Sequence, residues 1–458
     1  MTAEAVIYPN DPTDPIDAID AIDAIDPSAA LPADAAPAPS TPVTRRVVAA
    51  AVAGNALEFY DFGSYAFFAV YIGKAFFPAA NPFASLMLAL AVFGVGFVSR
   101  PLGGIFIGAY ADRAGRRPAM LLTILLMTLG TLGLALTPSY DSIGLAAPII
   151  MVICRLVQGL ALGGEVGPST AFLIEIAPPG KRGLYASWQL ASQGAASLLA
   201  GLVGMALTST LAPDELQSWG WRVPFVFGLL IIPLAIYLRR ALPETLGHVG
   251  RARGIALVPP VRLRSHSRLI FLAVLVVIGA TVSTYLGMYM TTYAIATLKL
   301  PPTVAMSATV AVGLTTPLFA LAGGWLADRY NRRSVMLIPR ILTALLVVPA
   351  FMLLIEARST AALIGVTTIL GALTAISAAA SLVAVPELLP ASIRATGLSI
   401  AYAVGVALFG GSTQLIVTWL IGVTGDPAMP AWYVVATSIV TALAIMALPE
   451  GRDRELAS

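Results

Sequence analysis

The sequence is poor in charge and in the residues that build metal sites and disulfides. Only 11% of its 458 residues are charged, and it has two histidines and one cysteine, Cys154. A single cysteine excludes a disulfide framework and a cysteine-rich metal site. The chain also has no motif for nucleotide binding, zinc proteolysis or a nucleophilic serine. We therefore expect no enzyme activity, no cofactor, no metal and no nucleic-acid partner.

Apolar residues dominate instead. They make up 58% of the chain, and the mean hydropathy is +0.86, whereas soluble domains are roughly one quarter charged. A membrane-spanning helix needs about 20 apolar residues. Runs of this kind occur at 47–73, 84–110, 118–137, 144–172, 183–211, 222–240, 268–297, 303–327, 334–355, 360–385, 394–424 and 430–448. The sequence thus predicts an all-α integral membrane protein with twelve transmembrane helices in a lipid bilayer.

Basic residues predict the orientation of the spans. If the N-terminus is cytoplasmic, the outer loops contain only Lys74, Lys299 and Arg358, and the other Lys and Arg outside the spans fall on the inner side. Cytoplasmic loops carry such an excess of basic residues. We expect a multi-pass protein of the cytoplasmic (inner) membrane with both termini in the cytoplasm.

The chain divides into two similar halves. The loop after the second span reads GAYADRAGRRPAM, and the loop after the eighth reads GWLADRYNRRSVM. An internal repeat of six spans is what a transporter with alternating access requires. The predicted segments are a disordered acidic tail (1–44), a six-helix bundle (45–240), a cytoplasmic linker (241–267), a second six-helix bundle (268–448) and a cytoplasmic tail (449–458).

Longer strings carry a family resemblance. GNALEFYDFGSYAFFAVYIGKAFFP, RPLGG, RLVQGLALGGEVG, EIAPPGKRGLYASWQ, WGWRVPF, RRALPET and PELLPASIRATGLSIAYAVGVALFGG together resemble the metabolite:proton symporter family of the major facilitator superfamily. FASLMLALAVFG, PSYDSIGLAAP and RGLYASWQLASQ look most like its citrate and tricarballylate carriers. The resemblance implies the major facilitator fold, with the first and fourth helices lining a central cavity. Asn331 and Gln414 depart from the family pattern, which expects Gly and Pro there.

Three polar residues share one face of the first span. Asn55, Glu58 and Asp61 are three residues apart, so they stay close to one side of a helix. Glu58 lies about 16 Å into the span, near its middle. A charge at that depth costs about 2.5 to 3.5 kcal/mol and indicates a functional site. We expect Glu58 or Asp61 to carry a coupling proton and Asn55 to bind substrate.

Two arginines are candidates for binding an anion. Arg155 and Gln158 share a face of the fourth span, and Arg100 lies at a similar depth in the second. A guanidinium offers forked donors that suit a carboxylate. We expect these three residues to bind substrate. In the alternative interpretation, the arginines and the carboxyls of the first span only neutralise one another as structural ion pairs.

Neutral side chains complete the predicted substrate site. Gln189 and Gln193 lie one turn apart on the fifth span, and Tyr285 and Tyr289 lie one turn apart on the seventh. Interhelical hydrogen bonding and packing are the alternative roles for these pairs. Arg340, near the inner end of the ninth span, is expected to extend its head group to the membrane surface. The C-terminal half is then expected to supply hydroxyls and aromatic surface to the substrate site, without a central charge.

Charged residues at the predicted inner ends of the spans are candidate gates. They occur in the repeated loops and along the fourth helix, where ion pairs can latch the halves together in one state. The predicted gating residues are Asp112, Arg116, Glu165, Glu175, Asp328 and Arg332.

The leading hypothesis is a monomeric symporter that couples a proton to a small organic carboxylate, with citrate or a related tricarboxylate favoured. A dicarboxylate, an oxoacid, shikimate or a zwitterionic osmolyte such as proline or betaine is the alternative substrate, and betaine would require aromatic caging of its ammonium group. A non-transporting membrane receptor is a hypothesis of another class. A membrane-embedded enzyme is disfavoured because no nucleophile has a base and a third partner.

Overall fold

A computed structural model describes residues 45–114, 116–163, 173–174, 176–240, 266–388, 401–402 and 404–448. Within these ranges the chain forms helices and no strand. The predicted acidic tail (1–44), most of the linker (241–265) and the C-terminal tail (449–458) lie outside the described residues.

Helices of the first half follow the predicted spans closely. The first and second spans are each built from two consecutive helices, α2 with α3 and α4 with α5. The bounds are α2 (Arg45–Phe67), α3 (Ala69–Phe76), α4 (Pro82–Val98), α5 (Arg100–Ala114), α6 (Arg116–Leu136), α7 (Tyr140–Ile143), α8 (Ala146–Gly163), α10 (Arg182–Thr210), α11 (Pro213–Ser218), η1 (Gly220–Arg222) and α12 (Val223–Arg240).

The second half is more regular. Its helices are α14 (Ser267–Ala296), α15 (Pro302–Arg329), α16 (Arg332–Ala357), α17 (Thr360–Leu388), η3 (Gly405–Gly410), α19 (Gly411–Thr424) and α20 (Met429–Ala447). Nine helical segments of the described chain are long and apolar enough to cross a membrane. Helix α2, which carries Glu58 and Asp61, and the shorter apolar stretches in α6 and α12 occupy the other three predicted spans.

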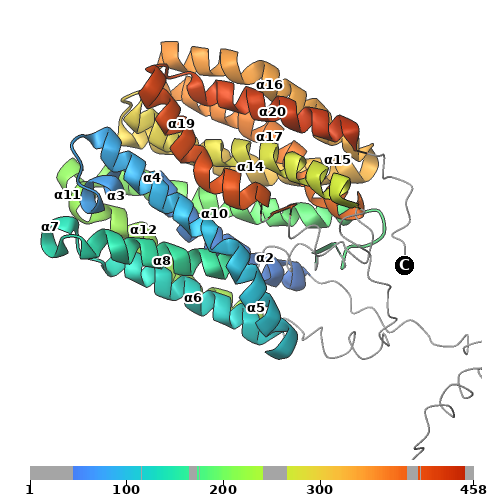
Figure 1. Cartoon of the computed structure of the whole chain (residues 1–458), viewed down its shortest axis with the longest axis horizontal. Helices are drawn as coiled ribbons and strands as arrows, with labels where there is room; N and C mark the ends of the chain where they lie inside the picture. Colours follow the sequence, from blue (N-terminus) through green and yellow to red (C-terminus); the bar gives the residue numbers. More distant parts are fainter. Residues whose placement is uncertain are drawn as a thin grey trace, which may run out of the picture. The chain divides into compact units, whose positions relative to one another are not determined.

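Helix α10 lies where the two sets of helices meet. In Figure 1, α14 to α20 occupy the upper part of the bundle, α2 to α8 with α12 occupy the lower part, and α10 runs between them. Helix α10 packs along α15 and also contacts α2 and α17. Its long contact with α15 joins the first half of the chain to the second.

Glycines allow the backbones of α10 and α15 to touch. A methyl group built on Gly313 would lie 2.3 Å from the backbone nitrogen of Leu198, and one on Gly183 would lie 2.5 Å from the carbonyl oxygen of Gly324. Small residues permit this close approach between membrane helices. The two halves therefore meet through main chain over much of this contact.

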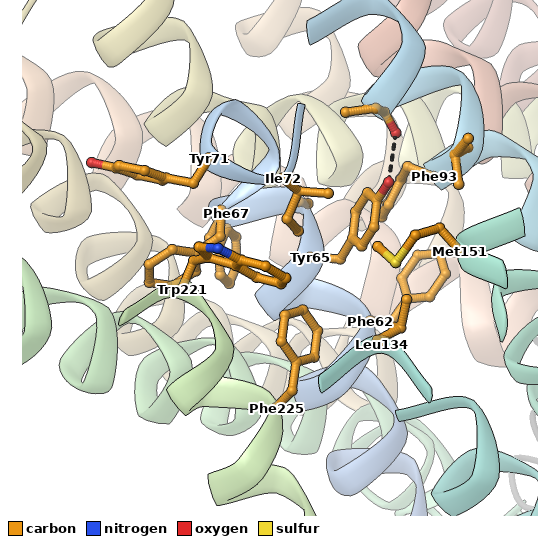
Figure 2. Close-up of a cluster of buried hydrophobic side chains, with 14 of the residues drawn as sticks. Phe62, Tyr65, Phe67, Tyr71, Ile72, Phe93, Leu134, Met151, Trp221 and Phe225 are labelled. Carbon is orange, nitrogen blue, oxygen red and sulfur yellow. Dashed lines mark hydrogen bonds between the residues drawn. The ribbon is translucent and has the colours of Figure 1, made fainter. Parts of the chain in front are cut away.

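An aromatic cluster fills the core between α2, α3, α4 and α12. Figure 2 shows Phe62, Tyr65, Phe93, Trp221 and Phe225 among its members. The Tyr65 hydroxyl donates a hydrogen bond of 3.1 Å to the carbonyl oxygen of Ala89, so the polar end of this ring is satisfied. This cluster packs α2 against α3, α4 and the start of α12.

Candidate functional site

Asn55 and Gln189 are joined by two hydrogen bonds between α2 and α10. The Asn55 Nδ2 donates to the backbone carbonyl oxygen of Gln189 at 3.0 Å and to the Ser192 hydroxyl at 2.8 Å, and the Gln189 Nε2 donates to the Asn55 Oδ1 at 2.8 Å. Both side chains are buried. Because these bonds run between the two helices, the two predicted substrate ligands also tie α2 to α10.

A chain of hydrogen bonds connects Asp61 to Arg155 through two neutral side chains. The Arg155 Nη1 donates to the Gln158 Oε1 at 2.8 Å, and the Gln158 Nε2 donates to the Thr131 hydroxyl at 3.0 Å. That hydroxyl donates in turn to the Asp61 Oδ2 at 2.5 Å. Every donor points toward the carboxylate, so the bonds polarise one another. The chain links α2, α6 and α8 in the protein interior.

Aromatic rings cover both arginines. The Arg155 guanidinium carbon lies 3.8 Å from the Tyr65 ring centroid, and that of Arg100 lies 3.8 Å from the Phe97 ring centroid. Phe62 contacts both groups, at 4.8 and 4.7 Å. A cation over an aromatic face is stabilised electrostatically, and more so when it is desolvated. The rings therefore hold two like charges near each other, and neither arginine has an ion pair with an acidic residue of the described chain.

The same two nitrogens of each guanidinium group are left without a hydrogen-bond partner among the described residues. Among the described residues, Nε and Nη2 of Arg100 and of Arg155 have no hydrogen-bond partner, although both side chains are buried. These two nitrogens form the parallel fork that binds a carboxylate bidentately. Glu58, three residues before Asp61, is also buried, with an exposed fraction of 2%.

A cavity of about 70 Å³ lies chiefly between α10 and helices α14 to α17. Of the predicted substrate residues, Gln193 lines it, and Arg100, Arg155 and Gln158 do not. The described residues that line it carry no charge, and their polar groups are chiefly Ser and Thr hydroxyls. Arg100 and Arg155 thus do not line this cavity.

The two predicted tyrosines are packed beside the cavity without lining it. The Tyr285 ring meets the Phe97 ring edge-on, with the centroids 5.2 Å apart. The Tyr289 hydroxyl oxygen accepts a hydrogen bond of 2.8 Å from the Thr418 hydroxyl. Tyr285 thereby joins the aromatic group that covers Arg100, and Tyr289 links α14 to α19.

The prediction for Arg340 is wrong. Its side chain is 1% exposed, and its Nη1 donates to the Gly279 carbonyl oxygen at 2.9 Å and to the Ser283 hydroxyl at 2.8 Å. The acceptors on α14 hold the guanidinium inside the bundle, so it does not reach the membrane surface. The second half therefore contains a buried cation, contrary to the expectation that it holds no central charge.

Two of the predicted gating residues make contacts at the same end of the bundle. The Asp328 carboxylate on α15 accepts hydrogen bonds from the backbone nitrogens of Gly183 and Leu184, at 2.6 and 2.8 Å, at the start of α10. A carboxylate is favourable at a helix N-terminus. Arg332 forms an ion pair with Glu387 at the end of α17. The side chains of Asp112 and Arg116, and the residues Glu165 and Glu175, lie outside the described part.

Sequence reasoning missed Thr131 and misplaced Arg340. A threonine in an apolar span is common, and nothing in the pattern distinguishes Thr131 from Thr128 one turn earlier. For Arg340, the available signal was its position two turns inside the helix, which is deep for a residue that reaches the surface.

The comparisons with known proteins identify the family. The chain matches the family described as "Sugar (and other) transporter" over residues 47–254 and 259–458. It belongs to this family of membrane transporters. A relative, the citrate-proton symporter of Klebsiella pneumoniae, is 38% identical over 393 residues, which cover 85% of this chain and 88% of the relative.

Two further comparisons extend this result. The proline/betaine transporter of Escherichia coli (strain K12) is 32% identical over 90% of this chain and 85% of its own. A crystal structure of a D-xylose-proton symporter matches 90% of this chain and 99% of its own with a TM-score of 0.71 at 19% identity. The match confirms the predicted fold, twelve transmembrane helices in two six-helix halves, and the family confirms a multi-pass membrane transporter.

Proposed function

We propose that the chain is a symporter that couples a proton to the transport of a small organic carboxylate, with citrate or a related tricarboxylate favoured. The observation that carries the proposal is the directed hydrogen-bond chain from Arg155 through Gln158 and Thr131 to Asp61. It joins a group that can bind a proton to a group that can bind a carboxylate. The relatedness to a citrate-proton symporter supports the same substrate class.

The chain of bonds suggests how proton and substrate influence each other. With Asp61 ionised, its negative charge orients the donors of Thr131 and Gln158 and favours the Arg155 charge. A proton on Asp61 removes that negative charge, so the open Nε and Nη2 edge of Arg155 gains more from a substrate carboxylate. Binding of either partner then favours the other by the same factor, as linkage requires. Glu58 supplies a second carboxyl on the same helix.

The proposed transport cycle moves the bundle 45–240 against the bundle 268–448 about the contact between α10 and α15. Asp328 holds the start of α10, and the Arg332–Glu387 ion pair fixes α16 to α17 at that end. We place this end, both termini and the linker 241–267 in the cytoplasm of a cell whose inner membrane contains the protein as a monomer. Release of the Asp328 contacts then opens the inner side.

The proposal is tested by uptake of labelled citrate into proteoliposomes under an inward proton gradient, with and without a protonophore. Thr131→Val removes the central hydroxyl of the chain, and Thr128→Val is its control because the Thr128 hydroxyl donates to the Ile124 carbonyl oxygen of its own helix. A hydrogen bond to a charged group contributes about 1.5 to 3 kcal/mol. We expect accumulation by the Thr131 variant to fall by about 10-fold to 100-fold, with citrate exchange retained.

The possible outcomes test the substrate class and the route of proton coupling separately. If the wild type accumulates none of citrate, succinate, 2-oxoglutarate and shikimate, the carboxylate proposal is wrong, and accumulation of betaine or proline instead selects the osmolyte alternative. Binding without any flux selects the receptor. If citrate accumulates equally in the Thr131 and Thr128 variants, the hydrogen-bond chain does not couple the proton.

A further inference from the structure

Arg340 is a buried cation that the mechanism above does not use. It lies in α16, and no acidic residue of the described chain pairs with it. The described acidic residues of the second half all stand at or beyond helix ends: Asp328, Glu356, Glu387 and Asp426. An uncompensated charge inside a membrane protein is costly, so its retention requires a reason other than packing.

The hydrogen bonds of Arg340 leave one edge of the guanidinium open. Nη1 has two hydrogens, and the Gly279 carbonyl and the Ser283 hydroxyl accept them. Nε and Nη2 have no partner among the described residues. These atoms carry the two parallel N–H groups that match a carboxylate. The protein thus fixes the group on one side and leaves the carboxylate-binding fork unused.

This arginine lies next to the cavity between the halves. Ser283, which accepts its hydrogen bond, lines the cavity, and so do Thr343 and Val347, one and two turns farther along the same helix. The cavity wall itself is neutral. Across the cavity, α10 presents Gln193 and Ser197. Arg340 is therefore a buried positive charge one side chain away from a neutral, hydroxyl-lined cavity.

We propose that this cavity is a carboxylate subsite in which Arg340 binds one carboxylate of the substrate through Nε and Nη2, while Ser283 orients the guanidinium. The ligand class is a small polycarboxylate whose remaining polar groups bond the cavity hydroxyls and Gln193. This inference rests on the proposed function and extends it, because it gives the second half its own charged contact with the substrate. The substrate is then held by both halves of the transporter.

The experiment measures citrate binding to the purified chain in lipid nanodiscs and citrate uptake into proteoliposomes. Arg340→Gln removes the charge, and Arg340→Lys keeps it without the fork. Arg358→Gln is the matched control, because the Arg358 side chain is exposed and donates to the Ile355 carbonyl oxygen at the end of the same helix. We expect Arg340→Gln to raise the Kd and KM for citrate by about 30-fold, which corresponds to about 2 kcal/mol. Arg340→Lys recovers part of the affinity, and the control stays within about twofold.

A structural role predicts a different result. If Arg340→Gln lowers the unfolding temperature but leaves Kd and KM unchanged, Arg340 is a packing residue and the inference is wrong. If that variant does not fold, Ser283→Ala decides the question, since it keeps the arginine and its bond to Gly279. We expect this variant to raise KM by about threefold to tenfold, and an unchanged KM overturns the proposal.

Failure of this inference differs from failure of the proposed function. Proton-driven citrate accumulation with an unchanged KM in the Arg340 variants rejects the subsite alone. Arg340-dependent citrate binding without proton-driven accumulation rejects the symporter and keeps the subsite. No carboxylate binding by the wild type rejects both.

Discussion

Replacing Gly313 by alanine should force α10 and α15 apart. The added methyl group would lie 2.3 Å from the Leu198 nitrogen and 2.4 Å from its Cα, whereas ordinary contact begins at 3.4 Å. The obstacle is backbone, which cannot rotate away, so the helices must separate locally by about 1 Å. Overpacking of this size costs about 1 to 3 kcal/mol. The closely packed state should therefore lose about 5-fold to 150-fold in population.

The matched control is Gly365→Ala in α17, where an added methyl group meets nothing within 4 Å. Both substitutions gain up to about 1 kcal/mol of helix propensity, so the difference between them isolates the clash. Unfolding temperature in detergent and the initial rate of citrate uptake are measured for both. Equal stability and equal uptake in the two variants would refute the reasoning that backbone contact between α10 and α15 holds the halves in this state.

Two further predictions concern the end of the bundle that holds Asp328. Asp328→Asn removes the charge at the start of α10 and should destabilise the closed end by about 0.3 to 1 kcal/mol. The measurement is the labelling of a Ser187→Cys variant with a membrane-permeant thiol reagent, which should increase. The control is Asp426→Asn, because the Asp426 carboxylate accepts a hydrogen bond from the Ala428 backbone nitrogen, away from α10. Equal labelling in both variants would contradict a role for Asp328 in keeping this end closed. Arg332→Glu should reduce uptake because it sets two negative charges together, and adding Glu387→Arg should restore it. Failure of this charge swap to restore uptake would show that the pair acts through more than its charges.

The position and the polar face of α2 were predictable from sequence, because apolar length and helical spacing determine both. Asn55, Glu58 and Asp61 are all buried, as their shared face predicted. Their partners were not predictable. Ser192 and Thr131 come from other helices, and the rotation and depth at which helices meet depend on packing that a single sequence does not encode locally.

The environment of Arg340 was also not predictable from the sequence. Its spacing from the helix start was visible in the sequence, but its environment depends on α14, which supplies Ser283 and the carbonyl of Gly279. A long basic side chain near a helix end reaches the membrane surface by default. Only the position of the neighbouring helix shows that this one turns inward and finds acceptors there.

The main-chain contact between α10 and α15 has a consequence for how transporters of this kind diversify. Gln193, which lines the cavity, stands directly beside Gly194, which packs against the side chains of Thr316 and Pro317. At Gly183 and Gly313 the contact is between glycine and backbone, so a cavity position such as Gln193 can accept a new side chain without altering it. Evolution can thus exchange the solute that is recognised while it conserves the moving parts, and relatives named for citrate and for proline and betaine are the outcome that such a separation permits.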